Sequence, residues 1–73
     1  MATLIVMDHT GDTRHHFDAS DAKALAKAER RFQELTGRGF TAAVRTAPGE
    51  VTRVRAFDPK ADETLFFPRL VGG

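Results

Sequence analysis

The chain has 73 residues and no cysteine, and its eleven basic and ten acidic residues nearly cancel. A single domain this small buries only about 60% of its unfolded surface, which leaves little room for a deep active-site cleft. The lack of cysteine excludes disulfides, thiolate nucleophiles and cysteine-based zinc sites, and the balanced charge gives no support to nucleic-acid binding. These features favour a carrier, a modifier or a binding module over an enzyme.

The first third of the sequence predicts a hairpin. Residues 3–8, "TLIVMD", are apolar and β-branched and indicate a strand. Residues 9–12, "HTGD", suit a turn because Gly11 accepts a positive φ, and residues 13–18, "TRHHFD", have the pattern of a returning strand. The apolar run "LIVM" is too short for a signal peptide or a membrane span, so we expect a cytoplasmic protein without a membrane partner.

Residues 18–37 predict the one amphipathic helix of the chain. Asp18 or Ser20 can cap it, and Asp21 suits the positive end of the helix dipole. Its apolar positions form a single stripe that must face a sheet: Leu25, Ala28, Phe32 and Leu35. Two glycines are expected to end the helix: Gly37 and Gly39.

The rest of the chain predicts three more strands. Residues 40–46, "FTAAVRT", alternate in polarity, and the Pro-Gly turn at 47–50 separates them from residues 51–57, "VTRVRAF". An acidic turn follows at residues 58–63, and residues 64–67, "TLFF", form the last strand before Pro68. In the second of these strands the pattern places Val54 and Ala56 on one face and two arginines, Arg53 and Arg55, on the other.

This order of elements, ββαβββ, predicts an α+β domain with a mixed sheet of four to five strands and the helix on one face. The two most apolar strands, at residues 3–8 and 64–67, are expected side by side and parallel at the sheet centre. We expect the domain to cover residues 1–67, with residues 68–73 as a flexible tail.

The order, the length and the ending "DETLFFPRLVGG" resemble ubiquitin-like β-grasp proteins. The tail is similar to the end of the molybdopterin-synthase small subunit, and "RLVGG" is similar to the end of ubiquitin. The similarity in motif covers about the last dozen residues, and the rest of the chain matches only in order and size. The tail departs from the first family at Arg69, where a second proline is usual.

The resemblance implies a protein that is a substrate and not a catalyst. Gly73 would carry the reactive carboxylate, and Gly72 beside it would pass through a narrow channel because it has no Cβ. The tail from Pro68 to Gly73 spans about 20 Å when extended. Its other residues would be docking contacts for a ubiquitin-activating-type enzyme, which uses ATP: Pro68, Arg69, Leu70 and Val71.

Three functions follow as hypotheses. As a modifier, the protein would be adenylated and joined to a target amine, with a conjugating enzyme and an isopeptidase as further partners. As a sulfur carrier, it would form a C-terminal thiocarboxylate. As a non-covalent binding module, it would use a polar sheet face that carries Arg45, Arg53 and Arg55, a set that departs from the apolar patch of ubiquitin. We expect the free protein to be a monomer without a bound cofactor or metal.

The histidines give a weaker signal. His15 and His16 are adjacent in a predicted strand, so their side chains point to opposite faces and do not readily share an ion. His9 lies across the hairpin and is expected, like them, to be a polar surface residue. The acidic residues of the turn at 58–63 lack the spacing of a calcium loop and are expected to be solvated: Asp58, Asp62 and Glu63.

Overall fold

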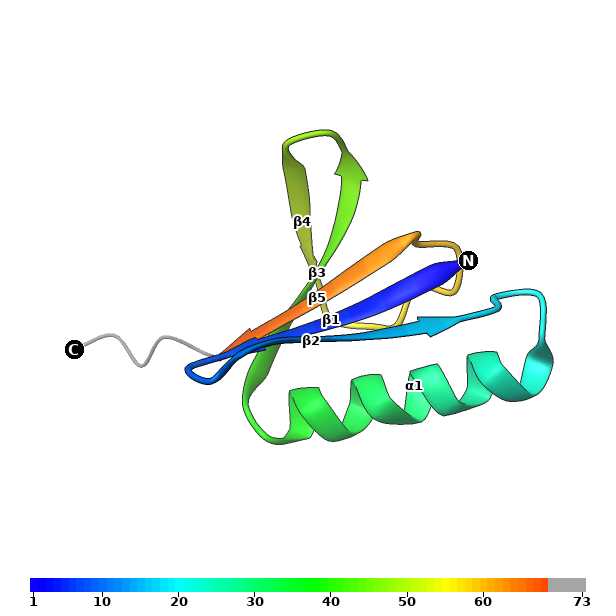
Figure 1. Ribbon diagram of the computed structural model, residues 1–73, viewed down its shortest axis with the longest axis horizontal. Helices are drawn as coiled ribbons and strands as arrows, with labels where there is room; N and C mark the ends of the chain where they lie inside the picture. Colours follow the sequence, from blue (N-terminus) through cyan, green and yellow to red (C-terminus); the bar gives the residue numbers. More distant parts are fainter. Residues whose placement is uncertain (69–73) are drawn as a thin grey trace.

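The computed structural model describes residues 1–68, apart from the side chain of Thr46. It is an α+β domain in which one helix lies across one face of a mixed five-stranded sheet (Figure 1). The elements are, in chain order, β1 (Ala2–Asp8), β2 (Gly11–Phe17), α1 (Ala22–Gly37), β3 (Phe40–Ala47), β4 (Glu50–Val54) and β5 (Glu63–Pro68).

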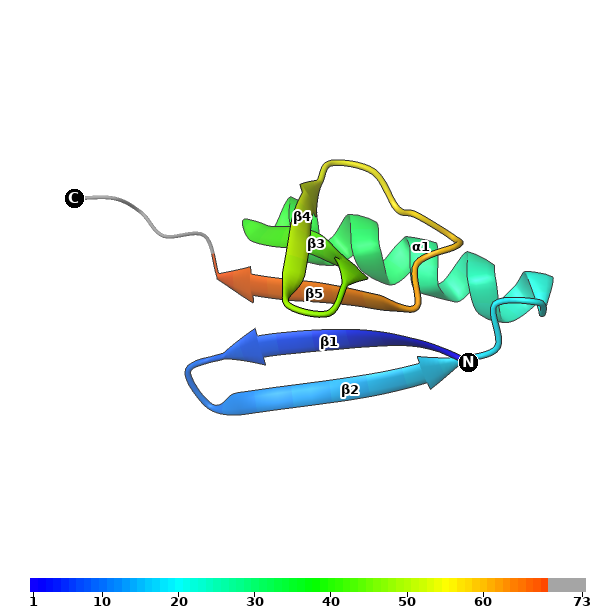
Figure 2. The same ribbon diagram turned by 90° about the horizontal axis from the view of Figure 1, so that it is seen from above.

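The strands lie in the order β2-β1-β5-β3-β4. The two most apolar strands, β1 and β5, are parallel neighbours, as their sequences predicted, and Ile5 pairs with Leu65. All other neighbours are antiparallel. Figure 2 shows β1 between β2 and β5, with the β3–β4 hairpin next to them. The first and last described strands, β1 and β5, are therefore hydrogen-bonded to each other in the middle of the sheet.

The helix begins later than the sequence indicated. Asp21 is its N-cap, and its carboxylate accepts a hydrogen bond from the Lys23 backbone N–H at 3.0 Å. Asp18, one of the two expected caps, instead accepts hydrogen bonds from the backbone and hydroxyl of Ser20, in the turn before the helix. Such local bonds compete with helix formation, which explains why the first predicted turn is not helical.

Helix α1 ends in two steps. Gly37 is still helical, and the backbone N–H of Arg38 caps the carbonyl groups of the last turn. Gly39 then adopts φ of +97°, a region that disfavours side chains, and redirects the chain into β3. Of the two glycines expected to end the helix, only Gly39 therefore needs to be glycine for its backbone angle.

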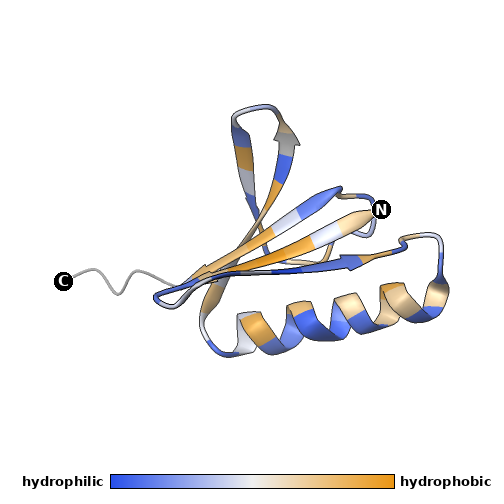
Figure 3. Cartoon of the chain, in the orientation of Figure 1, coloured by the Kyte–Doolittle hydropathy of each residue, from blue (hydrophilic) through white to orange (hydrophobic). Residues whose placement is uncertain are grey.

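The core lies between α1 and the sheet. Phe32 is 3% exposed, and its ring packs edge-on against Phe66 and Phe57, with centroid distances of 5.6 and 5.9 Å. Figure 3 shows the apolar colouring along the central strands. Leu25 was expected to be buried with Phe32 but is only half-buried, because it lies one to two turns nearer the start of the helix. The remaining members of the core cluster are Leu4, Val6, Ala28, Leu35 and Ala42.

The sheet face away from α1 is less polar than predicted. The strand registers place one row of residues across it, with an apolar centre and an arginine at each end: Arg14, Ile5, Leu65, Ala43 and Arg53. Its three central members are at most 8% exposed. Side chains of neighbouring strands are therefore enough to bury the middle of this face.

Two strand boundaries differ from the prediction. β4 ends at Val54, so Arg55 and Ala56 form a bend and not a strand. The bend lets Phe57 turn toward the core and contact Phe32, and this burial outweighs the continued alternation. β5 includes Pro68, which pairs with Phe40, so the sheet extends one residue past the expected domain boundary.

Candidate functional site

The end of β5 is where the predicted reactive segment joins the domain. Pro68 is exposed and lies opposite Phe40, the first residue of β3. In Figure 1 this end of the sheet also carries the β1–β2 turn and the connection from α1 to β3. The predicted docking residues Arg69, Leu70 and Val71, and the predicted reactive Gly72 and Gly73, lie outside the described residues.

Of the three arginines expected to share one face, Arg45 and Arg53 lie on the face away from α1, as predicted, whereas Arg55 lies on the helix side. Arg45 lies on β3, and its Nε donates to the Glu63 carboxylate at 2.8 Å across the sheet. Both side chains are partly exposed, at 43% and 35%. Glu63 was expected in a solvated acidic turn, but it belongs to β5. Arg45 thus has an acidic partner within the domain, whereas Arg53 and Arg55 form no ion pair within residues 1–68.

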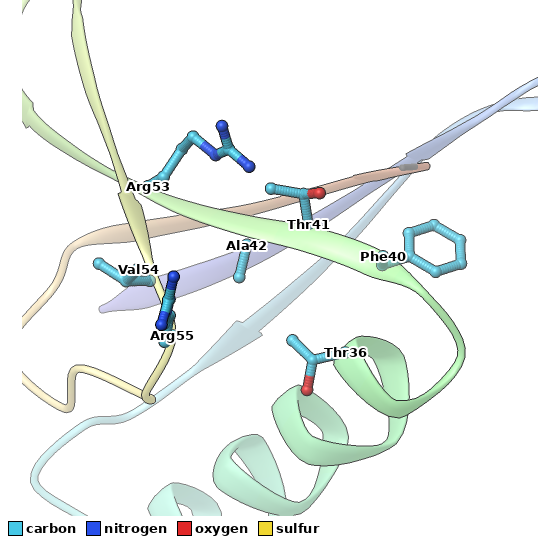
Figure 4. Close-up of a pocket in the computed structure, with 7 residues that line it drawn as sticks. All are labelled: Thr36, Phe40, Thr41, Ala42, Arg53, Val54 and Arg55. Atoms are coloured by element: carbon cyan, nitrogen blue, oxygen red, sulfur yellow. The ribbon is translucent and has the colours of Figure 1, made fainter. Parts of the chain in front are cut away.

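Arg53 and Arg55 line a cavity of about 550 Å³ at the outer edge of β3 (Figure 4). The cavity forms where β4 stops, because β3 continues past the last β3–β4 pair, which joins Ala42 to Val54. Thr41 and the half-buried Phe40 lie along this part of β3. No acidic residue lines the cavity, and neither arginine forms an ion pair within residues 1–68.

The two arginines approach this cavity from opposite sides of the sheet. Arg53 pairs with Ala43 and lies on the face away from α1. Arg55 also lines a second cavity formed with Glu29 and Gln33 of α1, so it lies on the helix side. Figure 4 shows the same arrangement, with Arg53 above β3 and Arg55 below it. The bend after Val54 separates them, since a continued strand would have kept both on one face.

A groove of about 330 Å³ lies between β2 and α1. Leu4, Phe17 and Ala28 contribute apolar surface to it, and Lys27 and Arg31 add positive charge. His15 pairs with Leu4 on this side. His16 also borders the groove, but it pairs with Thr3 on the opposite face, where its Nδ1 is 3.0 Å from the Thr3 hydroxyl, so the predicted divergence of the two side chains is confirmed.

Two exposed carboxyl groups have lowered pKa values. The Thr10 hydroxyl, followed by its backbone N–H, donates to Asp8 and lowers the pKa of that carboxyl below its ordinary value of 3.8. The Ser20 hydroxyl and backbone N–H lower the pKa of Asp18 in the same way. Both sites are turns, and the hydrogen bonds order the turn backbone, which indicates a structural role for these carboxylates.

Within residues 1–68 there is no group of three or more histidine or acidic side chains placed to hold a metal ion. In the same part of the chain, α1 is neither long nor apolar enough to cross a membrane. Comparisons of the chain with protein-family models, with curated proteins and with solved structures find no match.

Sequence reasoning missed the contribution of β3 to the arginine cavity. Phe40 and Thr41 were interpreted only as strand and core residues, although they start a strand directly after Gly39. No local signal could have shown this, because residues 51–57 alternate in polarity throughout, and the bend after Val54 follows from the packing of Phe57 against Phe32.

Proposed function

We propose that this protein is a ubiquitin-like modifier of the β-grasp fold. The strand order β2-β1-β5-β3-β4, with parallel central strands and one helix on one face, supports this fold assignment. The observation that carries the functional proposal is that β5, a central strand, ends at Pro68, and that the sequence continues from there through three residues to Gly72 and Gly73. In this proposal the Gly73 carboxylate lies five residues after the end of a strand that is paired on both sides.

The proposed chemistry takes place at the Gly73 carboxylate. A carboxylate is a poor electrophile, so an activating-type enzyme joins it to the AMP portion of ATP and releases pyrophosphate. A thiol of that enzyme attacks the acyl adenylate, forms a thioester and releases AMP. A target amine then displaces the thiol and forms an amide bond. Each bond is made by the partner enzymes, and this chain contributes the acyl group.

The remaining tail residues have docking roles in this proposal. Pro68 lacks an N–H and so cannot extend the sheet with a further donor. Arg69 supplies a fixed charge for an acidic partner, and Leu70 and Val71 supply apolar contacts. Glycine at the last two positions allows a nucleotide to approach the backbone closely.

The test is ATP–pyrophosphate exchange with the cognate activating-type enzyme. Deleting Gly72 and Gly73 should abolish exchange, because Val71 would then carry the carboxylate and its branched side chain obstructs close approach. Lys27→Gln, a change on the exposed side of α1, should leave exchange unaffected. Full exchange by the shortened chain would contradict the proposal.

Mass spectrometry of the C-terminus separates the modifier from the sulfur carrier. Attachment of Gly73 to an amine of a second protein supports the modifier. Replacement of one carboxylate oxygen by sulfur, formed when a sulfur donor attacks the same acyl adenylate, would instead identify a carrier. Both products require adenylation of Gly73 first. A chain that fails in pyrophosphate exchange therefore contradicts both functions, whereas the mass distinguishes between them.

A further inference from the structure

The free edge of β3 beside Arg53 and Arg55 has the features of a docking site for an extended chain. Thr41 and Phe40 pair with β5 on one side, through Phe67 and Pro68, and have no strand on the other side within residues 1–68. In an antiparallel ladder alternate residues direct their N–H and C=O groups outward. The backbone next to the cavity therefore offers hydrogen-bonding groups that a further strand can pair with.

The positive charge of the cavity indicates which side chains an added strand should carry. The cavity carries two arginines and no acidic residue, and the nearest ion pair on this sheet, Arg45–Glu63, does not involve them. Arginine binds carboxylates in a planar, two-pronged geometry. Glu29 shares the second cavity with Arg55 but forms no ion pair with it, so the guanidinium is not neutralised there.

The positions of the two arginines decide the spacing of the carboxylates. Arg53 lies on the face away from α1 and Arg55 on the helix side, with the β3 edge between them. Successive side chains of a strand point to opposite faces. Two adjacent acidic residues in an added strand therefore meet both arginines, whereas acidic residues two positions apart reach only one of them.

We propose that the β3 edge between Arg53 and Arg55 binds an extended acidic segment of a partner protein, with two consecutive carboxylate side chains. The site does not depend on activation of the C-terminus. A nucleic acid is the less suitable occupant, because the unpaired β3 backbone matches a peptide backbone and the net charge of the chain is only +1.

The test uses three synthetic hexapeptides, blocked at both ends, in titrations followed by amide NMR shifts of the full chain. The first has adjacent acids (Thr-Val-Glu-Glu-Val-Thr), the second is its isomer with spaced acids (Thr-Glu-Val-Glu-Val-Thr), and the third is neutral (Thr-Val-Gln-Gln-Val-Thr). We expect the first to shift the amides of Phe40, Thr41 and Arg55 and to bind at least about threefold more tightly than its isomer. The neutral peptide should bind weakest.

Two double variants locate the site. Arg53→Gln with Arg55→Gln should weaken binding of the first peptide at least about tenfold. Lys27→Gln with Arg31→Gln removes the same charge from the groove between β2 and α1, and should change binding by less than about twofold. All four side chains are exposed, so both variants should keep the natural amide spectrum of the core.

Several results would overturn the proposal. These are equal binding of the two isomers, equal binding by the Arg53/Arg55 variant, or no shift at about 5 mM peptide, a concentration that detects even millimolar affinity. A hexauridylate that binds more tightly than the first peptide, and depends on the same two arginines, would assign the site to RNA instead.

Discussion

Phe32 contacts aromatic rings from two other parts of the chain, and these contacts connect the helix to the sheet. It packs against Phe66 of the central strand β5 and against Phe57 from the loop after β4. Edge-to-face pairs of this kind add to the free energy gained by burial alone. One helix residue thus contacts both the central strand β5 and the loop that precedes it, each more than twenty residues away in the sequence.

Phe32→Ala should lower the free energy of unfolding by about 3–5 kcal/mol, because it removes a buried ring and leaves a cavity. Leu25→Ala should cost clearly less, since Leu25 is only half-buried. Urea unfolding of both variants checks this order. A loss below about 1 kcal/mol for Phe32→Ala would mean that α1 does not present this face to the sheet.

The same residue type has three environments in this molecule. Arg45 is paired with Glu63, Arg53 lies on the open face, and Arg55 lies on the helix side after the bend. The alternating pattern predicted one face for all three, which is confirmed for Arg45 and Arg53 and wrong for Arg55. Only two of them remain together at one cavity, and they reach it from opposite sides of the sheet.

The joint between α1 and β3 shows how an element boundary depends on one backbone angle. Gly37 and Gly39 are two residues apart, yet only Gly39 has a positive φ, of +97°. Apart from its neighbours along the chain and the backbone of its own helix, no heavy atom within residues 1–68 lies within 4 Å of a Cβ added to either glycine, so space is not the constraint at these positions. The stability effects of substituting Gly37 and Gly39 should therefore differ only because their φ angles differ.

Gly37→Ala should raise the free energy of unfolding by about 0.5–1 kcal/mol, because alanine loses less backbone entropy in a helix than glycine does. Gly39→Ala should lower it by about 1–2 kcal/mol, because alanine is strained at positive φ. Chemical denaturation of this matched pair measures both effects. Equal stability of the two variants would contradict the helix end described above.

On the scale of the whole molecule, β5 joins two halves of the sheet, β1–β2 and β3–β4, between which residues 1–68 form no other strand pairing. It pairs with β1, which carries β2, and with β3, which carries β4. It also supplies Leu65 and Phe66, at 8% and 0% exposure, one to each face of the sheet. The last strand in the sequence, β5, is therefore the one that connects the two halves of the sheet.

A chain that ends at Asp62, and so lacks β5, should show no cooperative unfolding transition by circular dichroism. A chain that ends at Pro68 should unfold within about 0.5 kcal/mol of the full chain, because every buried residue in the described part precedes Phe67. Comparing the two shortened chains shows whether the stability of the domain requires β5 and whether it requires residues 69–73. A folded domain in the first chain would show that the two halves do not need β5.

The sequence by itself determined much of this protein. It determined the α+β class, the one amphipathic helix, the parallel pairing of β1 with β5 and the divergence of His15 and His16, because these follow from local periodicity and from the apolar content of each strand. The hypothesis of a reactive C-terminus also came from the sequence, through the resemblance of residues 62–73 to the ends of ubiquitin-like proteins.

Only the tertiary structure decided where β4 stops and which arginines meet. Local alternation in residues 51–57 favours a strand throughout, but burial of Phe57 against Phe32 draws the chain off the sheet after Val54. The same bend leaves Thr41 without a paired strand on one side, as far as residues 1–68 show, and turns Arg55 to the helix side of the sheet. Long-range packing outweighs local pattern here, because the free energy of burying an aromatic ring exceeds the difference in strand propensity at two exposed positions.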